Sequence, residues 1–148
     1  MNRRELIRLG LYGSAASLVI PRAVVAEAAT APGPLQSALA GGVYYTRDAP
    51  GRWAKKVNSH VPEIEKQTGS DNKTDILDKT RHENDGYTHY IIKHVLLDSN
   101  FEFMQENMFD PTVTKWPESA FALEDYTGPL YALSVCNKHD TWIDVIEI

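Results

Sequence analysis

The sequence has very little cysteine: Cys136 is the only one among 148 residues. A single cysteine cannot form an intramolecular disulfide bond. In an exported protein, a free exposed thiol would also be a liability in an oxidising compartment. We therefore expect Cys136 to be buried, paired with another chain or bound to a metal ion.

Positive charge and long apolar segments are scarce as well. The chain has 15 lysine and arginine residues against 20 aspartate and glutamate residues, a formal net charge of −5. This balance argues against nucleic acid and anionic membrane surfaces as partners. Downstream of the N-terminal region no apolar run is long enough to cross a membrane, so we expect no membrane anchor in the mature chain.

The N-terminal region predicts an export signal. It begins with a basic stretch containing Arg3 and Arg4, continues with a short apolar run and ends at the small-residue motif Ala26-Glu27-Ala28. This order is typical of a cleaved signal peptide over residues 1–28. The paired arginines resemble a twin-arginine signal, with an ordinary Sec signal as the alternative. We therefore predict a periplasmic protein exported by the twin-arginine route.

Cleavage after residue 28 would leave one acidic domain. It removes four arginines and two glutamates, which changes the formal charge from −5 to −7. The remaining chain of about 120 residues has the size of a single domain. Residues 29–42 are rich in alanine, proline and glycine and are expected to form a flexible lead, and residues 43–148 the folded domain. Because the twin-arginine route carries folded proteins, often with the cofactor inserted, it favours a metalloprotein.

Short β-prone segments separated by turn signals run along residues 43–148. Tyr90–Leu97 is the strongest of them, and further candidate strands lie at residues 43–46, 118–123, 130–136 and 141–146. This pattern predicts an all-β fold, an immunoglobulin-like β-sandwich of about seven strands. Residues 74–79 fit either a helical turn or a strand. Residues 104–117 are expected to be irregular, because Pro111 and Pro117 interrupt them.

Cys136 and His139 lie on one polar loop between two predicted strands. The run before Cys136 is apolar and β-prone, and a second strand pattern begins at Thr141. A thiolate and an imidazole on one tight loop are held close together before a metal binds, which suits a metal site. The alternative is a cysteine that packs as a small apolar residue beside a surface histidine.

The other four histidines are candidate ligands of the same site: His60, His82, His89 and His94. Pro62 pushes the residue before it toward an extended conformation, so we expect His60 on an extended arm and not in a helix. Side chains alternate along a strand, so His89 and His94 would point to opposite faces of a strand over residues 88–97. If His89 is a ligand, His94 is expected to be a packed or surface histidine.

The number of remaining ligands limits the choice of metal. Four imidazoles and a thiolate exceed the four ligands of a structural zinc site. Five ligands with one open position suit an iron centre that reacts with a small oxygen species. A blue-copper site also uses cysteine and histidine on a β-sandwich, but it usually has a methionine shortly after the second histidine. Residues 140–148 contain none.

Three sequence blocks resemble the superoxide reductase family, which comprises neelaredoxin and the iron domain of desulfoferrodoxin. Leu130 to Trp142 is similar to the family's C-terminal motif, a Cys-Asn-x-His loop followed by tryptophan. His60-Val61-Pro62-Glu63-Ile64-Glu65 resembles its His-Val-Pro-x-Ile-Glu arm. Thr88-His89-Tyr90-Ile91 resembles its His-aromatic-Ile strand start, with His82 upstream. The sequence contains no four-cysteine rubredoxin-like domain, so it resembles the one-iron form.

The resemblance implies a fold, a cofactor and a reaction. The fold is an immunoglobulin-like β-sandwich, in agreement with the strand pattern. One iron ion per chain would be bound in one plane by His60, His82, His89 and His139, with Cys136 as the axial ligand opposite an open position. The ferrous ion would give one electron to superoxide, yielding hydrogen peroxide, and an electron donor protein would reduce it again. The resemblance is compatible with a homo-oligomer and does not fix the number of subunits.

This sequence departs from the family pattern in two places. The family usually has Glu-Lys directly before its first ligand histidine, where this chain has Asn58 and Ser59. The spacing from His82 to His89 is one residue longer than usual, and Glu83 stands where proline is common. The missing Glu-Lys pair favours an alternative function, a non-catalytic iron module that carries electrons or senses redox state. A copper or zinc protein is the remaining alternative.

Without the usual lysine, another cation must attract the anionic substrate. Lys138 lies between Cys136 and His139, and we predict it as the catalytic residue that steers superoxide to the site. The pair Lys55-Lys56, just before the His60 arm, comes second. The alternative for Lys138 is an ordinary solvated loop residue.

Overall fold

The computed structural model describes residues 37–69 and 73–148. The predicted signal peptide over residues 1–28 lies outside these residues, as does the first part of the predicted lead, and the domain boundaries stay a prediction. Among the residues described, no helix is long and apolar enough to cross a membrane.

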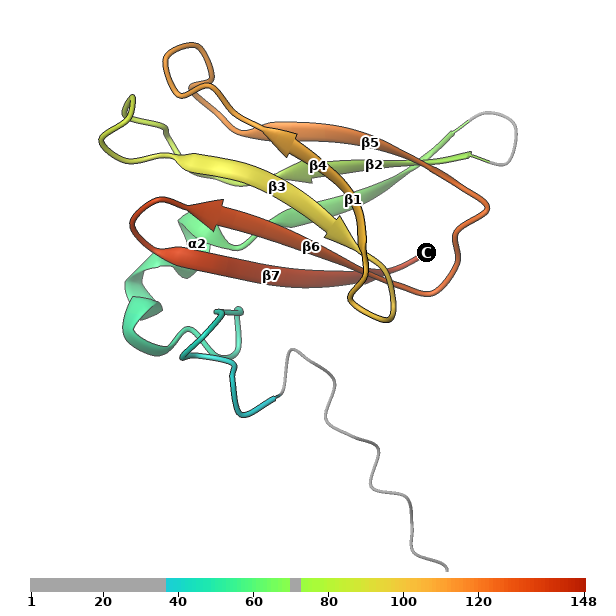
Figure 1. Ribbon diagram of the computed structural model, residues 1–148, viewed down its shortest axis with the longest axis horizontal. Helices are drawn as coiled ribbons and strands as arrows, with labels where there is room; N and C mark the ends of the chain where they lie inside the picture. The colour runs from blue at the N-terminus through green and yellow to red at the C-terminus, as the bar shows by residue number, and fades with distance from the viewer. Residues whose placement is uncertain (1–36, 70–72) are drawn as a thin grey trace, which may run out of the picture. The chain divides into compact units, whose positions relative to one another are not determined.

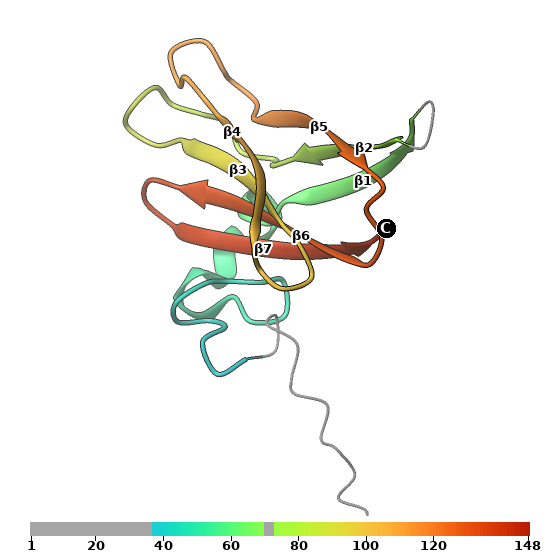
Figure 2. The same ribbon diagram turned by 45° about the vertical axis from the view of Figure 1, so that its right-hand side comes forward.

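Within residues 37–69 and 73–148, seven strands form two antiparallel sheets that face each other (Figures 1 and 2). The three-stranded sheet has the order β1-β2-β5, with β1 (Glu63–Thr68), β2 (Lys73–Lys79) and β5 (Glu118–Glu124). The four-stranded sheet has the order β4-β3-β6-β7, with β3 (Ile91–Leu97), β4 (Phe103–Met108), β6 (Pro129–Cys136) and β7 (Asp140–Glu147). The predicted all-β sandwich is confirmed.

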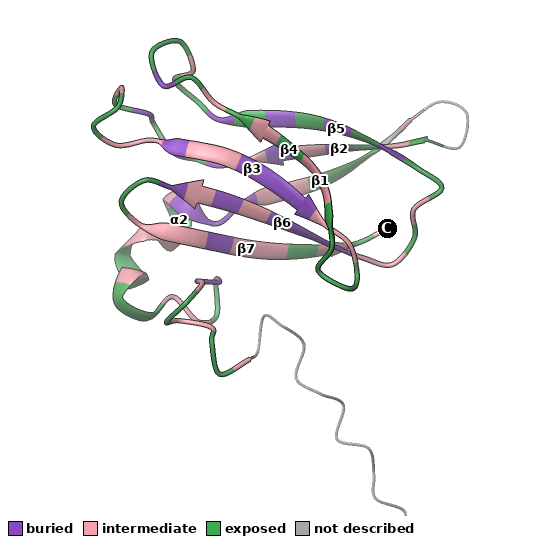
Figure 3. Cartoon of the chain, in the orientation of Figure 1, coloured by how far each residue is buried: buried purple, intermediate pink, exposed green. Residues whose placement is uncertain are grey.

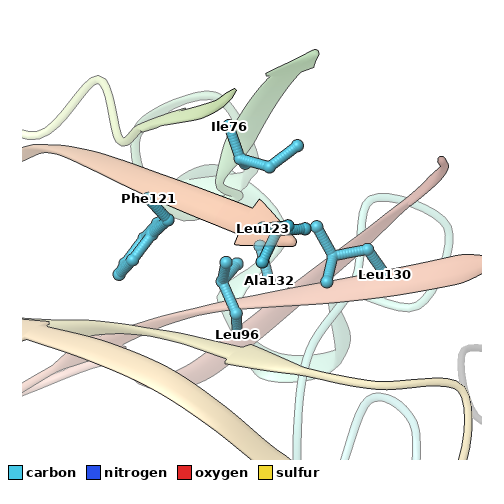
Figure 4. Close-up of a cluster of buried hydrophobic side chains, with 6 residues drawn as sticks. All are labelled: Ile76, Leu96, Phe121, Leu123, Leu130 and Ala132. Atoms are coloured by element: carbon cyan, nitrogen blue, oxygen red, sulfur yellow. The ribbon is translucent and has the colours of Figure 1, made fainter. Parts of the chain in front are cut away.

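Alternating side chains build the core between the sheets. In β5 the residues at every second position, Ser119, Phe121 and Leu123, are buried, and their neighbours are exposed (Figure 3). This two-residue period is that of a strand with one face on a core. Six residues from both sheets form the main apolar cluster (Figure 4): Ile76, Leu96, Phe121, Leu123, Leu130 and Ala132.

A short helical segment precedes β1. A 3₁₀-helix, η2 (Gly51–Lys56), continues into a single turn of α-helix, α2 (Val57–His60). His60 is the last residue of α2, so the prediction of an extended arm was wrong for His60 itself. Pro62 restricts only the residue directly before it: Val61 is the first extended residue, at φ −65° and ψ 128°.

Two strands lie where the sequence pattern was weak. The ambiguous segment 74–79 belongs to β2, in the middle of the three-stranded sheet. The expectation of an irregular segment over residues 104–117 was wrong at its start, because residues 104–108 belong to β4. β4 is an edge strand of its sheet and none of its six residues is fully buried, so it lacks the apolar alternation that marks a half-buried strand.

The alternation argument for His89 and His94 rested on a strand that starts too early. β3 begins at Ile91, and its register with β6 shifts between Ile91 and Lys93. A bulge of this kind breaks the simple alternation. His94 does lie apart from the other histidines, but for another reason. It is fully buried between the sheets, with a ring nitrogen 2.9 Å from each of the hydroxyls of Thr80 and Ser119.

Candidate metal centre

Three connecting segments bring five donor residues to one end of the sandwich. Cys136 ends β6, and His139 lies on the loop between β6 and β7. His60 ends α2, and His82 and His89 lie on the connection between β2 and β3. In Figure 1 this connection, α2 and the β6–β7 loop lie at the same end of the two sheets.

Four imidazole nitrogens form a close series at this end. His82 Nε2 lies 3.0 Å from His89 Nε2, and His89 Nε2 lies 2.9 Å from His139 Nδ1. His139 Nδ1 in turn lies 2.9 Å from His60 Nε2. The thiol is beside them, with Cys136 Sγ 3.7 Å from His139 Nδ1. Ligand atoms of His60, His82, His89 and Cys136 all lie within 4.8 Å of one another.

Hydrogen bonds alone cannot account for these contacts. Neighbouring side chains fix two of the tautomers. Ser59 Oγ donates to the carbonyl of Lys56, so His60 Nδ1–H donates to Ser59 Oγ at 2.8 Å. His82 Nδ1–H donates to Asn84 Oδ1 at 3.0 Å. Each neutral imidazole carries one proton, so Nε2 of both His60 and His82 faces the centre with a lone pair.

The three nitrogen–nitrogen contacts therefore share at most two protons, one each from His89 and His139. At least one contact is repulsive unless a cation lies between the nitrogens. Two nitrogens at right angles about a metal ion, each ~2.1 Å from it, lie about 3.0 Å apart. The observed spacing of 2.9–3.0 Å matches that value. The four imidazoles and the thiol therefore fit a single metal ion.

Burial keeps the histidines in the form that binds metal. Together with the charges of the neighbouring histidines, which contribute less, it lowers the pKa of His60 to about 3. Burial likewise lowers the pKa of His82 to about 4, with His89 as the next cause. Both rings are therefore neutral at neutral pH, as metal ligation requires.

The thiol needs a positive charge close to it. Burial raises the pKa of Cys136, and the backbone N–H groups of Lys138 and His139 lower it by a smaller amount. The backbone N–H of Lys138 donates to Sγ at 3.4 Å. Because the net shift disfavours the thiolate, a bound cation is what would hold Cys136 ionised.

Asn84 positions His82, and it was not identified from the sequence as a residue of the site. Its Oδ1 accepts from His82 Nδ1 and, at 2.9 Å, from the N–H of Ile91 at the start of β3. Its Nδ2 donates to the carbonyl of Thr114 at 3.0 Å. One amide thus ties the longer His82–His89 loop to β3. Nothing in the local sequence separates this role from that of a turn residue.

Trp53 and Asp140 position His139. The ring of Trp53 meets the His139 ring edge to face, with centroids 4.6 Å apart, and its Nε1–H donates to Asp140 Oδ2 at 2.8 Å. Asp140 follows His139 in a left-handed conformation, φ 63°, and also pairs with Arg52 at 2.5 Å. On the other side of the loop, the buried Trp142 donates from Nε1 to the carbonyl of His139 at 2.9 Å.

Two lysines bring positive charge to the centre. Lys138 is exposed on the loop between β6 and β7. Burial is the main cause of the lowered pKa of His89 and His139, and the charge of Lys138 adds to it. Lys56 lowers the pKa of these two histidines, of His82 and of Cys136. Lys56, which the sequence ranked second, therefore acts on more of the site than Lys138.

Comparison with known proteins agrees with the motif blocks. The family model described as desulfoferrodoxin matches residues 52–144, which include all five donor residues. A search of curated protein sequences found no match.

Solved structures of the same fold include superoxide reductases. That of the superoxide reductase (neelaredoxin) from Ignicoccus hospitalis is 26% identical, with a TM-score of 0.59, and the match covers 73% of this chain and 95% of that one. A variant of the Archaeoglobus fulgidus neelaredoxin, in the reduced form, is 21% identical with a TM-score of 0.53, over 64% of this chain and 91% of that one. At this identity the likeness shows the fold alone. The family model spans more than half of the sequence, and the chain therefore belongs to the desulfoferrodoxin family.

Proposed function

We propose that this protein is a superoxide reductase. Its reaction adds one electron and two protons to superoxide and yields one hydrogen peroxide. One observation carries the proposal: four imidazole nitrogens and one thiol meet at one end of the sandwich, with 2.9–3.7 Å between neighbouring donor atoms. These donor residues belong to the three sequence blocks that resemble the superoxide reductase family. The 26% identical neelaredoxin from Ignicoccus hospitalis, a superoxide reductase by name, supports the same assignment.

The donor set fits iron better than the alternative metals. When bound, iron supplies one electron by changing between its ferrous and ferric states. His60, His82, His89, His139 and Cys136 would hold it, and five donors exceed what a structural zinc site uses. A blue-copper site usually has a weak axial methionine ligand. Met104 and Met108 lie on the edge strand β4, and the Met108 side chain is 65% exposed.

The other residues of the site control approach and orientation. Lys56 and Lys138 would attract the superoxide anion to one end of an otherwise acidic protein. Ser59, which stands where the family has lysine, is engaged with Lys56 and His60 and so orients a ligand. It offers no charge, and we assign the two protons of the reaction to solvent water.

The second candidate is a non-catalytic iron module, favoured by Asn58 and Ser59 in place of the Glu-Lys pair. Stopped-flow mixing of the ferrous protein with superoxide separates the two functions. A reductase is oxidised in a fast bimolecular step whose rate rises in proportion to superoxide concentration. An electron carrier or redox sensor of the same fold would stay ferrous over the lifetime of superoxide in the mixing cell.

We further propose that the protein works in the periplasm after export by the twin-arginine route, with a separate protein as electron donor. The basic start with Arg3 and Arg4 supports this. Changing both arginines to lysine should leave the precursor in the cytoplasm, which fractionation and immunoblotting would detect. Normal export of that double variant would indicate a Sec signal.

A further inference from the structure

Three of the four histidines at the metal centre have a neighbouring side chain that fixes the ring. These pairs are Ser59 with His60, Asn84 with His82, and Trp53 with His139. His89 differs from the other three. Within residues 37–69 and 73–148, its Nδ1 has no hydrogen-bond partner, and its Nε2 faces the other donors. The place of the His89 ring therefore depends on the backbone that carries it.

That backbone is a turn that closes mainly on itself. The Asp85 N–H donates to the His89 carbonyl at 2.8 Å, and the Thr88 N–H donates to the Asp85 carbonyl at 3.1 Å. In the described part of the chain, every hydrogen bond from the backbone of residues 85–90 to another segment ends at Asn137. Asn137 is thus the hydrogen-bonded link between this turn and the β6–β7 loop.

Four hydrogen bonds make this link. The Asn137 backbone N–H donates to the Tyr90 carbonyl at 3.1 Å, and Asn137 Oδ1 accepts from the Tyr90 N–H at 3.0 Å. Asn137 Nδ2 donates to the carbonyls of Tyr87 and Thr88 at 3.3 Å and 3.4 Å. Tyr90 and Thr88 are the two neighbours of His89 in the chain. The asparagine therefore holds the backbone on both sides of this donor.

Asn137 also adjoins the thiol. It follows Cys136 directly, and Cys136 Sγ lies 3.9 Å from Asn137 Oδ1. β3 and β6 pair as far as Ile91 and Cys136, and the Asn137 side chain continues that pairing beyond the end of β6. From this geometry we infer that Asn137 is a positioning residue of the metal centre, which fixes His89 relative to the Cys136 sulfur. The inference rests on the iron site of the proposed function.

A positioning role and a purely structural role predict different results. The groups behind metal ligands tune both the affinity for the metal and its reduction potential. If Asn137 sets the place of His89 beside the sulfur, its loss changes iron affinity and the thiolate-to-iron absorption band. If it only ties two loops together, its loss lowers the stability of the apo protein and leaves the iron-loaded spectrum as it was.

The first variant removes the side-chain part of the link. Asn137→Ala loses three hydrogen bonds and keeps the backbone bond to Tyr90. It should weaken ferrous iron binding at least tenfold, as loss of such a partner typically does, and shift the charge-transfer band. Chelator competition and absorption spectroscopy measure the two effects, and urea unfolding of the apo protein records any structural loss separately.

Asn107→Ala is the matched control. Asn107 lies on β4 and its Nδ2 donates to Ser119 Oγ at 3.0 Å, so its loss also removes a side-chain hydrogen bond between two segments. None of the five donor residues is involved. The control should keep the wild-type iron affinity and the wild-type band.

A second variant keeps the shape of the side chain. Asn137→Asp still accepts from the Tyr90 N–H, cannot donate to the carbonyls of Tyr87 and Thr88, and puts a negative charge beside the sulfur. It should hold iron more tightly than Asn137→Ala. Its reduction potential should be lower than that of the wild type, because the negative charge favours the ferric state. Redox titration of this variant decides the inference even if Asn137→Ala does not fold.

Wild-type iron affinity and a wild-type band in Asn137→Ala would overturn the positioning role. So would an equal loss of affinity in Asn107→Ala, or a wild-type potential in Asn137→Asp. None of these measurements uses superoxide. A wild-type ferrous protein that ignores superoxide overturns the proposed reductase function, and the affinity, band and potential then still decide the role of Asn137.

Discussion

His139 Nδ1 and His60 Nε2 lie 2.9 Å apart, although 79 positions separate the two residues in the chain. A different neighbouring side chain fixes the orientation of each imidazole ring. Ser59 accepts from the His60 ring, and Trp53 packs against the His139 ring. The spacing of the donor atoms is therefore set by the fold before any metal binds.

The thiol should determine the electronic spectrum of the iron protein. Cys136→Ser should abolish the thiolate-to-iron charge-transfer band, because a hydroxyl cannot replace a soft charged donor. His94→Ala should leave the band nearly unchanged, since His94 contacts Thr80 and Ser119 and none of the donor residues. Absorption spectroscopy with iron analysis checks both variants. Iron loss in His94→Ala together with iron retention in His82→Ala would refute the ligand set.

Asn84 should control how tightly iron is held. Asn84→Ala removes the acceptor that keeps His82 Nε2 pointed at the centre. Removing such a partner typically costs 10- to 100-fold in metal affinity. Chelator competition measures this loss. Asn100→Ala, in the exposed loop between β3 and β4, is the control and should keep the wild-type affinity.

A buried carboxyl in the core should make stability depend on pH. Asp78 is fully buried, and neither of its oxygens has a hydrogen-bond partner within the described part of the molecule. Burial raises the pKa of Asp78 well above its ordinary value of 3.8. The folded protein therefore binds a proton that the unfolded chain releases above pH 3.8. This contribution to stability is complete below that pH and is lost as pH rises through the folded-state pKa.

Asp78→Asn removes that titration. The variant should be more stable than the wild type at pH 8, by about 1–3 kcal/mol, because no carboxylate need be desolvated. The difference should shrink at pH 4. Urea unfolding of the apo protein at the two pH values measures it. A variant that is less stable than the wild type at pH 8 would show that Asp78 is ionised and paired with His94, 3.6 Å away.

Positive charge at the site should accelerate the reaction with superoxide. Lys56→Ala and Lys138→Ala should each lower the bimolecular rate and flatten its dependence on ionic strength, because screening then has less attraction to remove. The drop should be larger for Lys56, whose charge reaches four of the donor residues. Lys138→Arg should keep most of the rate, since steering needs charge and not a transferable proton. Lys66→Ala is the control, and an equal effect there would show that net charge alone matters.

The parts of the site that could be predicted are those whose chemistry is local in the sequence. Cys136 and His139 share one hairpin loop, so their proximity follows from the strand pattern on either side. Strands with one buried face, such as β5, show the expected alternation. The edge strand β4 does not, because it has no fully buried residue to mark it.

Other features depend on contacts between distant segments and could not be predicted. The bulge in β3 becomes visible only in its register with β6, and it breaks the alternation on which the His94 argument relied. Trp53 reaches Asp140 across 87 positions, and Asn84 reaches Thr114 across 30. The residues next to Trp53 or Asn84 in the sequence give no sign of such a contact. The structure therefore adds the residues that orient the ligands.

The most direct test of the central claim is the product balance of a single turnover. The fully ferrous protein is mixed with a known amount of superoxide below the iron concentration, and hydrogen peroxide, dioxygen and ferric iron are measured. A reductase should form one hydrogen peroxide and one ferric ion for each superoxide consumed, with no dioxygen. Release of dioxygen, with half as much hydrogen peroxide and no net iron oxidation, would mean that the protein dismutates superoxide and would contradict the assignment.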